Sequence, residues 1–193
     1  MKFLKALIIE LANFFIFLIT FCPGKTGVFL RKSFLKIMFK ELGKNFYSEI
    51  GLFITGHKNI IIRNNCRFMR HSSINADKNR SIKIGDNLSV NYNVNINSCN
   101  HGYIEIGNGV LIGQNTVLRA SDHKISDQNK KINEQNHSGG KIIIGNNVWI
   151  GSNCVILKNV KIEDNSVIGA GTVVSKNEVV VGNQQRFLKK MYN

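Results

Sequence analysis

Aliphatic residues recur at every sixth position over much of this 193-residue chain, and this period constrains the fold more than any other feature. In residues 144–180 seven consecutive members of the series are aliphatic, and the same period appears over 84–96 and 106–118 and more weakly over 62–74. A period of six matches neither an α-helix nor a simple alternating strand. It predicts coils with three flat faces, in which each aliphatic residue points inward and stacks on its counterpart one coil later.

The turns between the faces can be assigned from glycine, asparagine and aspartate. Glycine often follows the aliphatic residue, and asparagine or aspartate comes one or two positions later, as in 85–87, 107–108 and 145–147. These residue types tolerate the positive φ that tight turns need. A second small or apolar residue four positions on is expected to fill each corner, at Leu88, Val94, Val110, Val148, Cys154 and Val160. The pattern predicts an all-β parallel β-helix whose stacked coils share one core.

Two segments interrupt the period. Residues 97–105 form a short excursion, and residues 120–141 form a long polar loop between two coils. Long loops carried by a rigid scaffold are where functional residues concentrate. The 120–141 loop is therefore the first place to look for a functional site.

Charge and cysteine content limit the partners and the compartment. The chain has 26 basic and 12 acidic residues, a net charge of +14, which favours an anionic partner such as nucleic acid, anionic lipid or a phosphate-bearing cofactor. Much of the basic excess lies in the N-terminal segment and the tail, and no recognised nucleic-acid module is present, so we expect no nucleic acid partner. The four cysteines form no CxxC pair and are expected to be reduced, as in the cytosol.

The N-terminal segment, residues 1–45, differs from the rest of the chain in composition. Residues 6–22 are almost entirely apolar, with a length at the lower limit for a membrane span. Residues 28–39 alternate apolar and basic residues at roughly helical spacing, which suits a helix lying on anionic headgroups. Basic residues after the apolar run place the downstream side in the cytoplasm. We expect a helical, membrane-associating segment on the inner face of the cytoplasmic membrane; the alternative is that the segment only caps the core.

One block of the repeat is similar to a known family. Residues 141–176, KIIIGNNVWIGSNCVILKNVKIEDNSVIGAGTVVSK, closely resemble the hexapeptide-repeat acyltransferases, and more narrowly the maltose, galactoside and polysaccharide O-acetyltransferases. The resemblance implies a left-handed parallel β-helix, assigned here to residues 46–182, and a homotrimer with active sites between neighbouring subunits. It also implies acetyl-CoA as the acyl donor, with no metal. We expect residues 183–193 to form a short C-terminal helix.

The resemblance also implies a catalytic histidine just before the long loop. The matching segment here is ASDHKISD, which contains His123. A sugar hydroxyl must lose its proton as it attacks a thioester, and a neutral imidazole can accept that proton and return it to the departing thiolate. No acyl-enzyme is needed. Asp122, Asp127 and Glu134 are all candidates to orient the imidazole, whereas His137, within the loop, is expected to be exposed to solvent.

For the acceptor, family members use an asparagine on the coil before the excursion. The best match in VNYNVNI is Asn91, with Asn93 close by. A carboxamide both donates and accepts hydrogen bonds, which suits sugar hydroxyls. The family often carries an aspartate about eight residues on, where this chain has Ser98, Cys99 and Asn100 instead, and Ser98 is the acceptor-binding candidate at this place. His101, in the same excursion, is a further candidate to line the cleft.

For the acetyl-CoA donor, the resemblance points to positions near the end of the repeat. Small residues in the turns would leave room for the extended pantetheine arm between two subunits, and basic residues near the end would meet the phosphates. The matching positions are Ser152, Ala170, Ser175, Lys176, Arg186 and Lys189. Gln184 stands where the family has a proline, which is a departure from the usual C-terminal close.

The sequence therefore predicts acetyl transfer to a sugar hydroxyl of a surface polysaccharide or its lipid-linked precursor. The main alternative is N-acetyl transfer to an amino sugar. A zinc carbonic anhydrase on the same fold needs two histidines five residues apart, and no pair among the five histidines has that spacing. A non-catalytic scaffold does not account for the long loop that carries His123.

Overall fold

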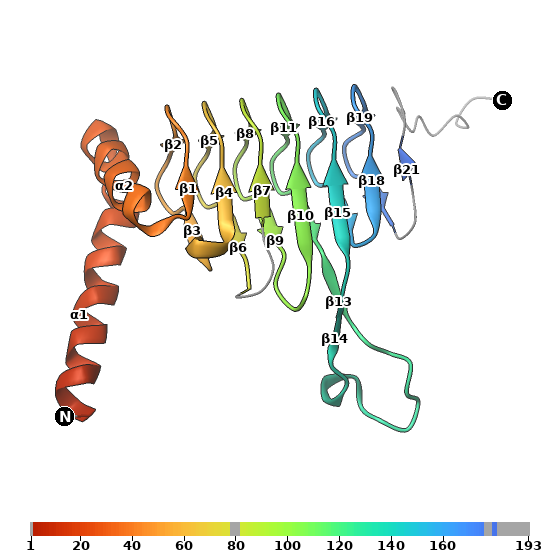
Figure 1. Ribbon diagram of the computed structural model, residues 1–193, viewed down its shortest axis with the longest axis horizontal. Helices are drawn as coiled ribbons and strands as arrows, with labels where there is room; N and C mark the ends of the chain where they lie inside the picture. The colour runs from red at the N-terminus through yellow and green to blue at the C-terminus, as the bar shows by residue number, and fades with distance from the viewer. Residues whose placement is uncertain (1, 78–81, 176–178, 181–193) are drawn as a thin grey trace.

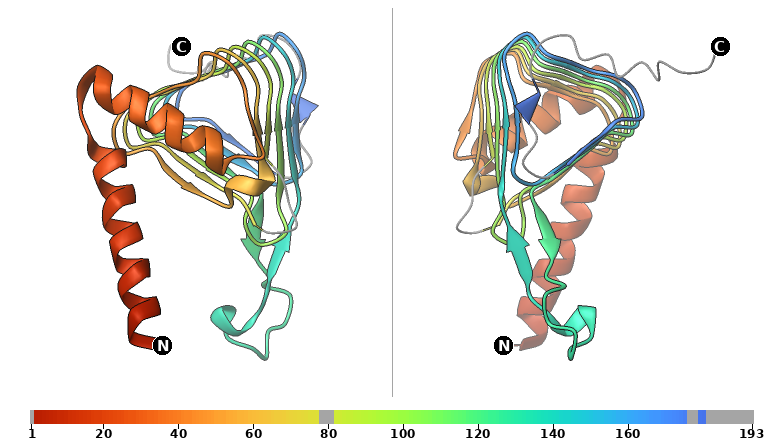
Figure 2. Two further views of the ribbon diagram at one scale, coloured as in Figure 1. Left: turned by 60° about the vertical axis from the view of Figure 1, so that its left-hand side comes forward. Right: turned by 90° about the vertical axis from the view of Figure 1, so that its right-hand side faces the viewer.

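The computed structural model describes residues 2–77, 82–175 and 179–180, which fold as a parallel β-helix with two helices at its N-terminal end (Figure 1). The chain begins with α1 (Lys2–Phe21) and α2 (Gly24–Met38), and the first coil starts with β1 (Glu41–Leu42). Viewed along its axis, the β-helix has a triangular cross-section (Figure 2). The predicted parallel β-helix is confirmed. The C-terminal helix predicted over 183–193 lies outside the described residues.

Three parallel sheets form the three faces of the prism. Sheet A consists of β1, β4 (Ile60–Ile62), β7 (Ile82–Ile84), β10 (Tyr103–Ile106), β15 (Lys141–Ile144), β18 (Val160–Ile162) and β21 (Val179–Val180). Sheet B consists of β2 (Tyr47–Ser48), β5 (Arg67–Phe68), β8 (Ser89–Val90), β11 (Leu111–Ile112), β16 (Trp149–Ile150) and β19 (Val167–Ile168). Sheet C consists of β3 (Phe53–Thr55), β6 (Ser73–Asn75), β9 (Asn95–Asn97), β12 (Val117–Arg119), β17 (Val155–Leu157) and β20 (Val173–Val174).

The core consists of aliphatic columns that run along the axis of the prism. In sheet A, Ile62, Ile84 and Ile106 lie one above the other in successive coils and are almost fully buried. The corner positions predicted from the sequence are also buried, among them Leu88 and Cys154. Each coil therefore contributes a similar layer of apolar side chains, and stacking removes the upper and lower surfaces of that layer from water.

Asparagine ladders close the turns at two edges of the prism. At the B–C edge, where the chain passes from sheet B to sheet C, Asn93 donates to Asn115 and Asn115 donates to Asn153, both at 3.1 Å. These three residues have φ values of 55°, 57° and 58°. At the A–B edge Asn147 donates to Asn165 at 2.7 Å. Asparagine suits these positions because it tolerates the left-handed conformation and because its side-chain amide can form a hydrogen bond with the asparagine of the next coil.

The C–A edge, where the chain passes from sheet C back to sheet A, is irregular. Hydrogen-bonded partners in neighbouring coils are separated by 18 residues in the last coils, but by 20 and 22 residues in the first ones and by 38 residues around the long loop. The additional residues lie at the C–A edge and include a short 3-10 helix (His57–Asn59), the turn 98–102 and the segment 120–140. These three segments therefore project from the same edge of the prism (Figure 2).

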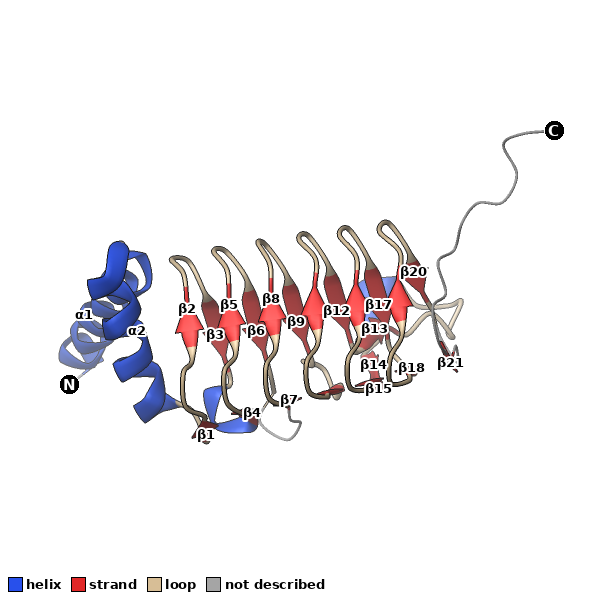
Figure 3. Cartoon of the chain, turned by 90° about the horizontal axis from the view of Figure 1, so that it is seen from above, coloured by secondary structure: helices blue, strands red, loops and turns tan. Residues whose placement is uncertain are grey.

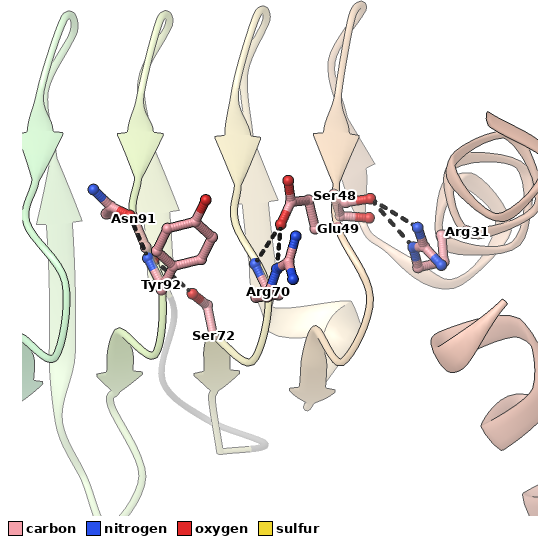
Figure 4. A network of polar contacts seen from close by, with 7 residues as sticks. All are labelled: Arg31, Ser48, Glu49, Arg70, Ser72, Asn91 and Tyr92. Atoms are coloured by element: carbon pink, nitrogen blue, oxygen red, sulfur yellow. Dashed lines mark hydrogen bonds and ion pairs between the residues drawn. The ribbon is translucent and has the colours of Figure 1, made fainter. Parts of the chain in front are cut away.

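α2 lies across the N-terminal end of the prism (Figure 3). Its Leu35, together with Phe39 just after it, is buried in the core. Arg31 is also buried, and its Nε and Nη2 donate to the carbonyl oxygen of Ser48 at 3.2 and 3.1 Å (Figure 4). Its Nη1 donates to the carbonyl oxygen of Cys22 at 2.7 Å, and burial lowers the pKa of the guanidinium. The alternative in which the N-terminal segment caps the core thus describes α2.

α1 extends past the edge of the prism (Figures 1 and 2). Its large apolar side chains are exposed along most of its length; Leu11, Phe14 and Phe15 are each 61% accessible. Near its C-terminal end Ile19 is buried. In the part of the chain that the structure describes, no helix has both the length and the apolar character needed to cross a bilayer.

Candidate active site

A short hairpin leaves the C–A edge between the fourth and fifth coils. Its two strands, β13 (Ser121–His123) and β14 (His137–Gly139), pair antiparallel, so that His123 lies directly opposite His137. Side chains directly opposite each other in an antiparallel pair lie on the same face. The two imidazole rings accordingly meet, with their centroids 4.0 Å apart and their planes tilted by 40°.

The opposite face of the hairpin is attached to the prism by a buried lysine. Lys158 lies in the tight turn after β17, and its Nζ forms an ion pair with Asp122 Oδ2 at 3.2 Å. The same Nζ donates to the carbonyl oxygen of Ser138 at 2.9 Å. Both strands of the hairpin are therefore held by one cation, which fixes the root from which His123 and His137 project.

His123 is exposed, whereas His137 is half-buried. Burial lowers the pKa of His137, and electrostatic interaction with His123, Arg119 and His101 lowers it further. Its Nδ1 is shielded from solvent and has no hydrogen-bond partner among the described residues. His137 was predicted to be exposed to solvent; instead the cross-strand pairing places it against His123.

None of the three acidic candidates is hydrogen-bonded to His123 in the described part of the chain. Asp122 points to the other face of the hairpin, where it pairs with Lys158. Asp127 forms an ion pair with Lys130 in the loop. Glu134 is exposed, in the 3-10 helix Ile132–Glu134. The residue in contact with the His123 ring is His137, which sequence reasoning missed because only the hairpin register brings the two together.

The four residues predicted to bind the acceptor lie in different places. His101 is exposed in the turn before β10, and its carbonyl oxygen packs so closely on Gly139 that a Cβ there would lie 2.0 Å from it. Ser98 is fully buried, with its hydroxyl directed to the carbonyl oxygen of Asn75 at 3.4 Å, so it does not face a substrate. The side chain of Asn93 belongs to the B–C ladder.

Asn91 is exposed at the B–C edge rather than near the hairpin. Its Oδ1 accepts a hydrogen bond from the backbone N–H of Tyr92 at 2.8 Å, and its carbonyl oxygen accepts one from Ser72 Oγ at 3.0 Å (Figure 4). The Tyr92 ring lies 5.6 Å from the guanidinium carbon of Arg70. The Nε of Arg70 donates a hydrogen bond to Glu49 Oε2 at 3.0 Å. These contacts hold the turn around Asn91 in one conformation.

Two predicted donor-binding residues stack along the same B–C edge. Ser152 is half-buried and its carbonyl oxygen accepts from the N–H of Gly171 at 2.8 Å, next to the exposed Ala170. Ser175 follows β20 at the C–A edge and is half-buried. Lys176, Arg186 and Lys189 lie outside the described residues.

A groove of about 400 Å³ beside this edge contains residues that sequence reasoning did not select. Its lining includes Asn91, Tyr92, Leu111 and Trp149. Trp149 is 53% and Leu111 50% accessible, although both belong to strands of sheet B. An aromatic residue at an outward strand position, as in VWIG, was the available signal. Such a surface can stack against a planar or apolar part of a ligand.

Across 2–77, 82–175 and 179–180 no group of three or more histidine, cysteine, aspartate or glutamate side chains is arranged to hold a metal ion.

The repeat region of the chain is similar to known proteins. Residues 141–176 match the family described as bacterial transferase hexapeptide (six repeats). The chain is 33% identical over 146 residues to the galactoside O-acetyltransferase of Escherichia coli K12, an alignment covering 76% of this chain and 59% of that protein. It is 30% identical to the galactoside O-acetyltransferase of Lactococcus lactis, covering 70% and 58%. The matched region thus spans less than two thirds of either relative.

Solved structures give the same fold. A maltose O-acetyltransferase from Clostridium difficile aligns with a TM-score of 0.55 and 29% identity, covering 91% of this chain and 82% of that one. A structure of AntD, an N-acyltransferase from Bacillus cereus in complex with dTDP and coenzyme A, aligns with a TM-score of 0.67 over 79% and 81% of the two chains. Its sequence identity is 22%, so this second likeness bears on the fold alone.

Proposed function

We propose that this chain is an acetyl-CoA-dependent O-acetyltransferase that acts on a sugar hydroxyl, because residues 141–176 match the bacterial transferase hexapeptide family and the chain is 33% identical to a galactoside O-acetyltransferase. The observation that carries the proposal is the exposed imidazole of His123 at the root of the hairpin, where the chain leaves the β-helix. An exposed imidazole on a rigid root can reach a bound acceptor, and imidazole can accept a proton near neutral pH.

The proposed reaction is a direct transfer. The acceptor hydroxyl attacks the thioester carbonyl carbon of acetyl-CoA while His123 accepts the hydroxyl proton. The tetrahedral intermediate then collapses, the C–S bond breaks, and the imidazolium returns the proton to the departing thiolate. The products are an acetyl ester and free CoA thiol, and His123 is regenerated. The buried thiols of Cys66 and Cys154, whose pKa values are raised by burial, are not placed to act as nucleophiles.

We propose that the site is shared between neighbouring subunits of a homotrimer. His123 and His101 lie at the C–A edge, whereas Asn91, Ser152 and Ala170 lie at the B–C edge. The two edges flank sheet C, so the two groups do not converge within one chain. A head-to-tail ring in which one subunit places its B–C edge against the C–A edge of the next would bring them together, and closed rings of this kind are a common oligomer type.

The donor is proposed to lie along the B–C edge of one subunit. The side chains of Ala170 and Ser152 are small, so they leave room along this edge for the extended pantetheine arm. The exposed ring of Trp149 lies beside the edge. Ser175, at the C–A edge, would contact the donor from the neighbouring subunit, and Lys176, Arg186 and Lys189 are proposed as partners for the CoA phosphates.

We further propose that α1 lies in the interface of the cytoplasmic membrane, on its inner face. The support is the exposure of Leu11, Phe14 and Phe15 together with the exposed Lys32 and Lys36 of α2. Apolar burial combined with attraction to anionic headgroups is the basis of such interfacial binding. The acceptor would then be a surface polysaccharide or its lipid-linked precursor.

The test of the reaction is to incubate the full-length protein with acetyl-CoA and a panel of glycans and to follow the free thiol. Acceptor-dependent thiol release, with an alkali-labile acetyl ester in the product, is expected. An alkali-stable acetamide on an amino sugar would favour N-acetyl transfer instead. No acceptor-dependent release with any glycan or amino sugar would contradict the proposal.

The membrane proposal needs a truncation that leaves the cap intact. Deleting residues 2–15 keeps the carbonyl groups of Ile19, Thr20 and Cys22, to which Arg31 donates. The full-length protein should sediment with vesicles containing anionic lipid, and the truncated protein should remain in the supernatant. Equal sedimentation of the two proteins would contradict a role for α1.

A further inference from the structure

We infer that His137 is a positioning residue for His123, holding its imidazole by ring packing across the hairpin and remaining uncharged while it does so. The inference rests on the proposed role of His123 and adds to it a residue that the family resemblance does not supply. It starts from the cross-strand register, in which the two residues lie directly opposite each other.

The His123 ring needs an external support. It is exposed, and in the described part of the chain no hydrogen bond fixes its orientation. A base must keep its lone pair directed at the acceptor proton, and a small displacement of a reacting group is costly to the rate. The ring of His137, 4.0 Å away between centroids, is the aromatic group in contact with it.

His137 is itself well held. The strand that carries it is joined to the prism through Ser138, whose carbonyl oxygen accepts from the buried Lys158. On the other side the carbonyl group of His101 packs on Gly139, an approach that only glycine permits. His137 therefore forms a fixed surface, whereas His123 on the paired strand is exposed.

The charges around the pair favour an uncharged His137. The neighbouring Arg119, His101 and His123 disfavour a charge on this ring, and Asp122 on the far face is paired with Lys158. When His123 takes the acceptor proton, a second imidazolium 4.0 Å away would oppose it. A neutral ring does not, and an aromatic face can attract a neighbouring cation. The chemistry needed at position 137 is thus an uncharged aromatic ring.

The decisive comparison is between His137→Phe and His137→Ala in the full-length protein. Phenylalanine keeps an uncharged ring at the contact, so its kcat should stay within about threefold of wild type. Alanine removes the ring, so kcat should fall about tenfold while the KM for acetyl-CoA is unchanged. Asn136→Ala, which shortens the exposed side chain next in sequence, serves as the matched control and should behave as wild type.

A spectroscopic readout makes the test independent of turnover. The ring proton on Cε1 of His123 should show an upfield ring-current shift in wild type that persists in His137→Phe and disappears in His137→Ala. Equal loss of kcat in both variants, or full activity in His137→Ala, would overturn the inference. If no variant and no wild-type protein releases thiol, the proposed function fails, and the shift alone decides whether the ring contact exists.

Discussion

The B–C edge and the C–A edge of the same prism are built on different principles. At the B–C edge successive turns have the same length, and Asn93, Asn115 and Asn153 repeat one conformation and one hydrogen bond. At the C–A edge the turns vary in length, and the longest carries a hairpin with His123 and His137. Regular turns use their polar side chains for the fold, whereas an irregular turn leaves them available for chemistry.

This contrast separates residues of one type that would otherwise look equivalent. Asn91 and Asn93 are two positions apart. The side chain of Asn93 is hydrogen-bonded in the asparagine ladder, whereas Asn91 is exposed and lines the groove together with Trp149. The difference arises because the four-residue turn 91–94 places Asn93, and not Asn91, in the left-handed position. The predictions below test whether function is divided between the two edges in this way.

The largest effect is expected for His123→Ala at the C–A edge. Removing the general base should lower kcat by roughly 10² to 10⁴, because the acceptor hydroxyl then has no positioned proton acceptor. Acetyl-CoA affinity and the oligomeric state should not change, since the imidazole contacts neither the phosphates nor the core. Steady-state kinetics at saturating acetyl-CoA and calorimetric binding measure both quantities.

His101→Ala is the companion variant for this prediction. His101 lies at the same C–A edge but is not in the ring pair, so the loss should be smaller and appear mainly in the KM for the acceptor. If His101→Ala were inactive and His123→Ala active, the base would be His101 and the long hairpin would have another role.

A bulky residue at the B–C edge should damage donor binding instead. Ala170→Trp places a large ring where the pantetheine arm is proposed to lie, so the Kd for acetyl-CoA should rise about tenfold or more. Lys44→Trp adds the same ring to the A–B edge, where we propose no ligand, and should leave the Kd unchanged. Equal Kd values for the two variants would remove the donor from the B–C edge.

Stability should depend on the ladder and not on the asparagine beside the groove. The side chain of Asn115 is hydrogen-bonded to Asn93 and Asn153, and its φ of 57° is unfavourable for alanine. Asn115→Ala should therefore lower the free energy of unfolding by about 2 kcal/mol per subunit. Asn115→Gly, which tolerates this φ, should recover part of the loss. Asn91→Ala should change the free energy of unfolding little and raise the KM for the acceptor. Urea unfolding measures the first quantity and steady-state kinetics the second.

The repeat could be predicted from the sequence because each inward position has a simple apolar requirement. Ile62 and Phe68, in the weaker early repeats, are both fully buried as expected. The placement of His137 could not be predicted, because it depends on the antiparallel register of a hairpin within a loop. The side chain of Ser98 could not be placed either, since a serine that fills a corner of the core has the same sequence context as one that faces a ligand.

The smallest effect concerns pH and also belongs to the C–A edge. Burial lowers the pKa of His57 in the folded state, so the unfolded chain binds its proton first as the pH falls. Stability should therefore fall as the pH drops below about 6.5 and level off once His57 is protonated in the folded state as well. Because the ring is partly exposed, the contribution should be a few tenths of a kcal/mol. Thermal unfolding of His57→Gln between pH 7 and pH 5 should show a correspondingly weaker pH dependence than wild type.

The division of the site between two edges can be tested by mixing two impaired proteins and assaying them at acetyl-CoA concentrations well below the Kd of Ala170→Trp. His123→Ala damages only the C–A edge, and Ala170→Trp damages only the B–C edge. If each site combines the C–A edge of one subunit with the B–C edge of its neighbour, randomly mixed trimers of the two variants contain intact sites. Equal co-expression should then restore about a quarter of wild-type activity, since each of the two required edges is intact in about half of the subunits. Activity that stays at the level of the separate variants, in trimers shown to contain both chains, would contradict a shared site.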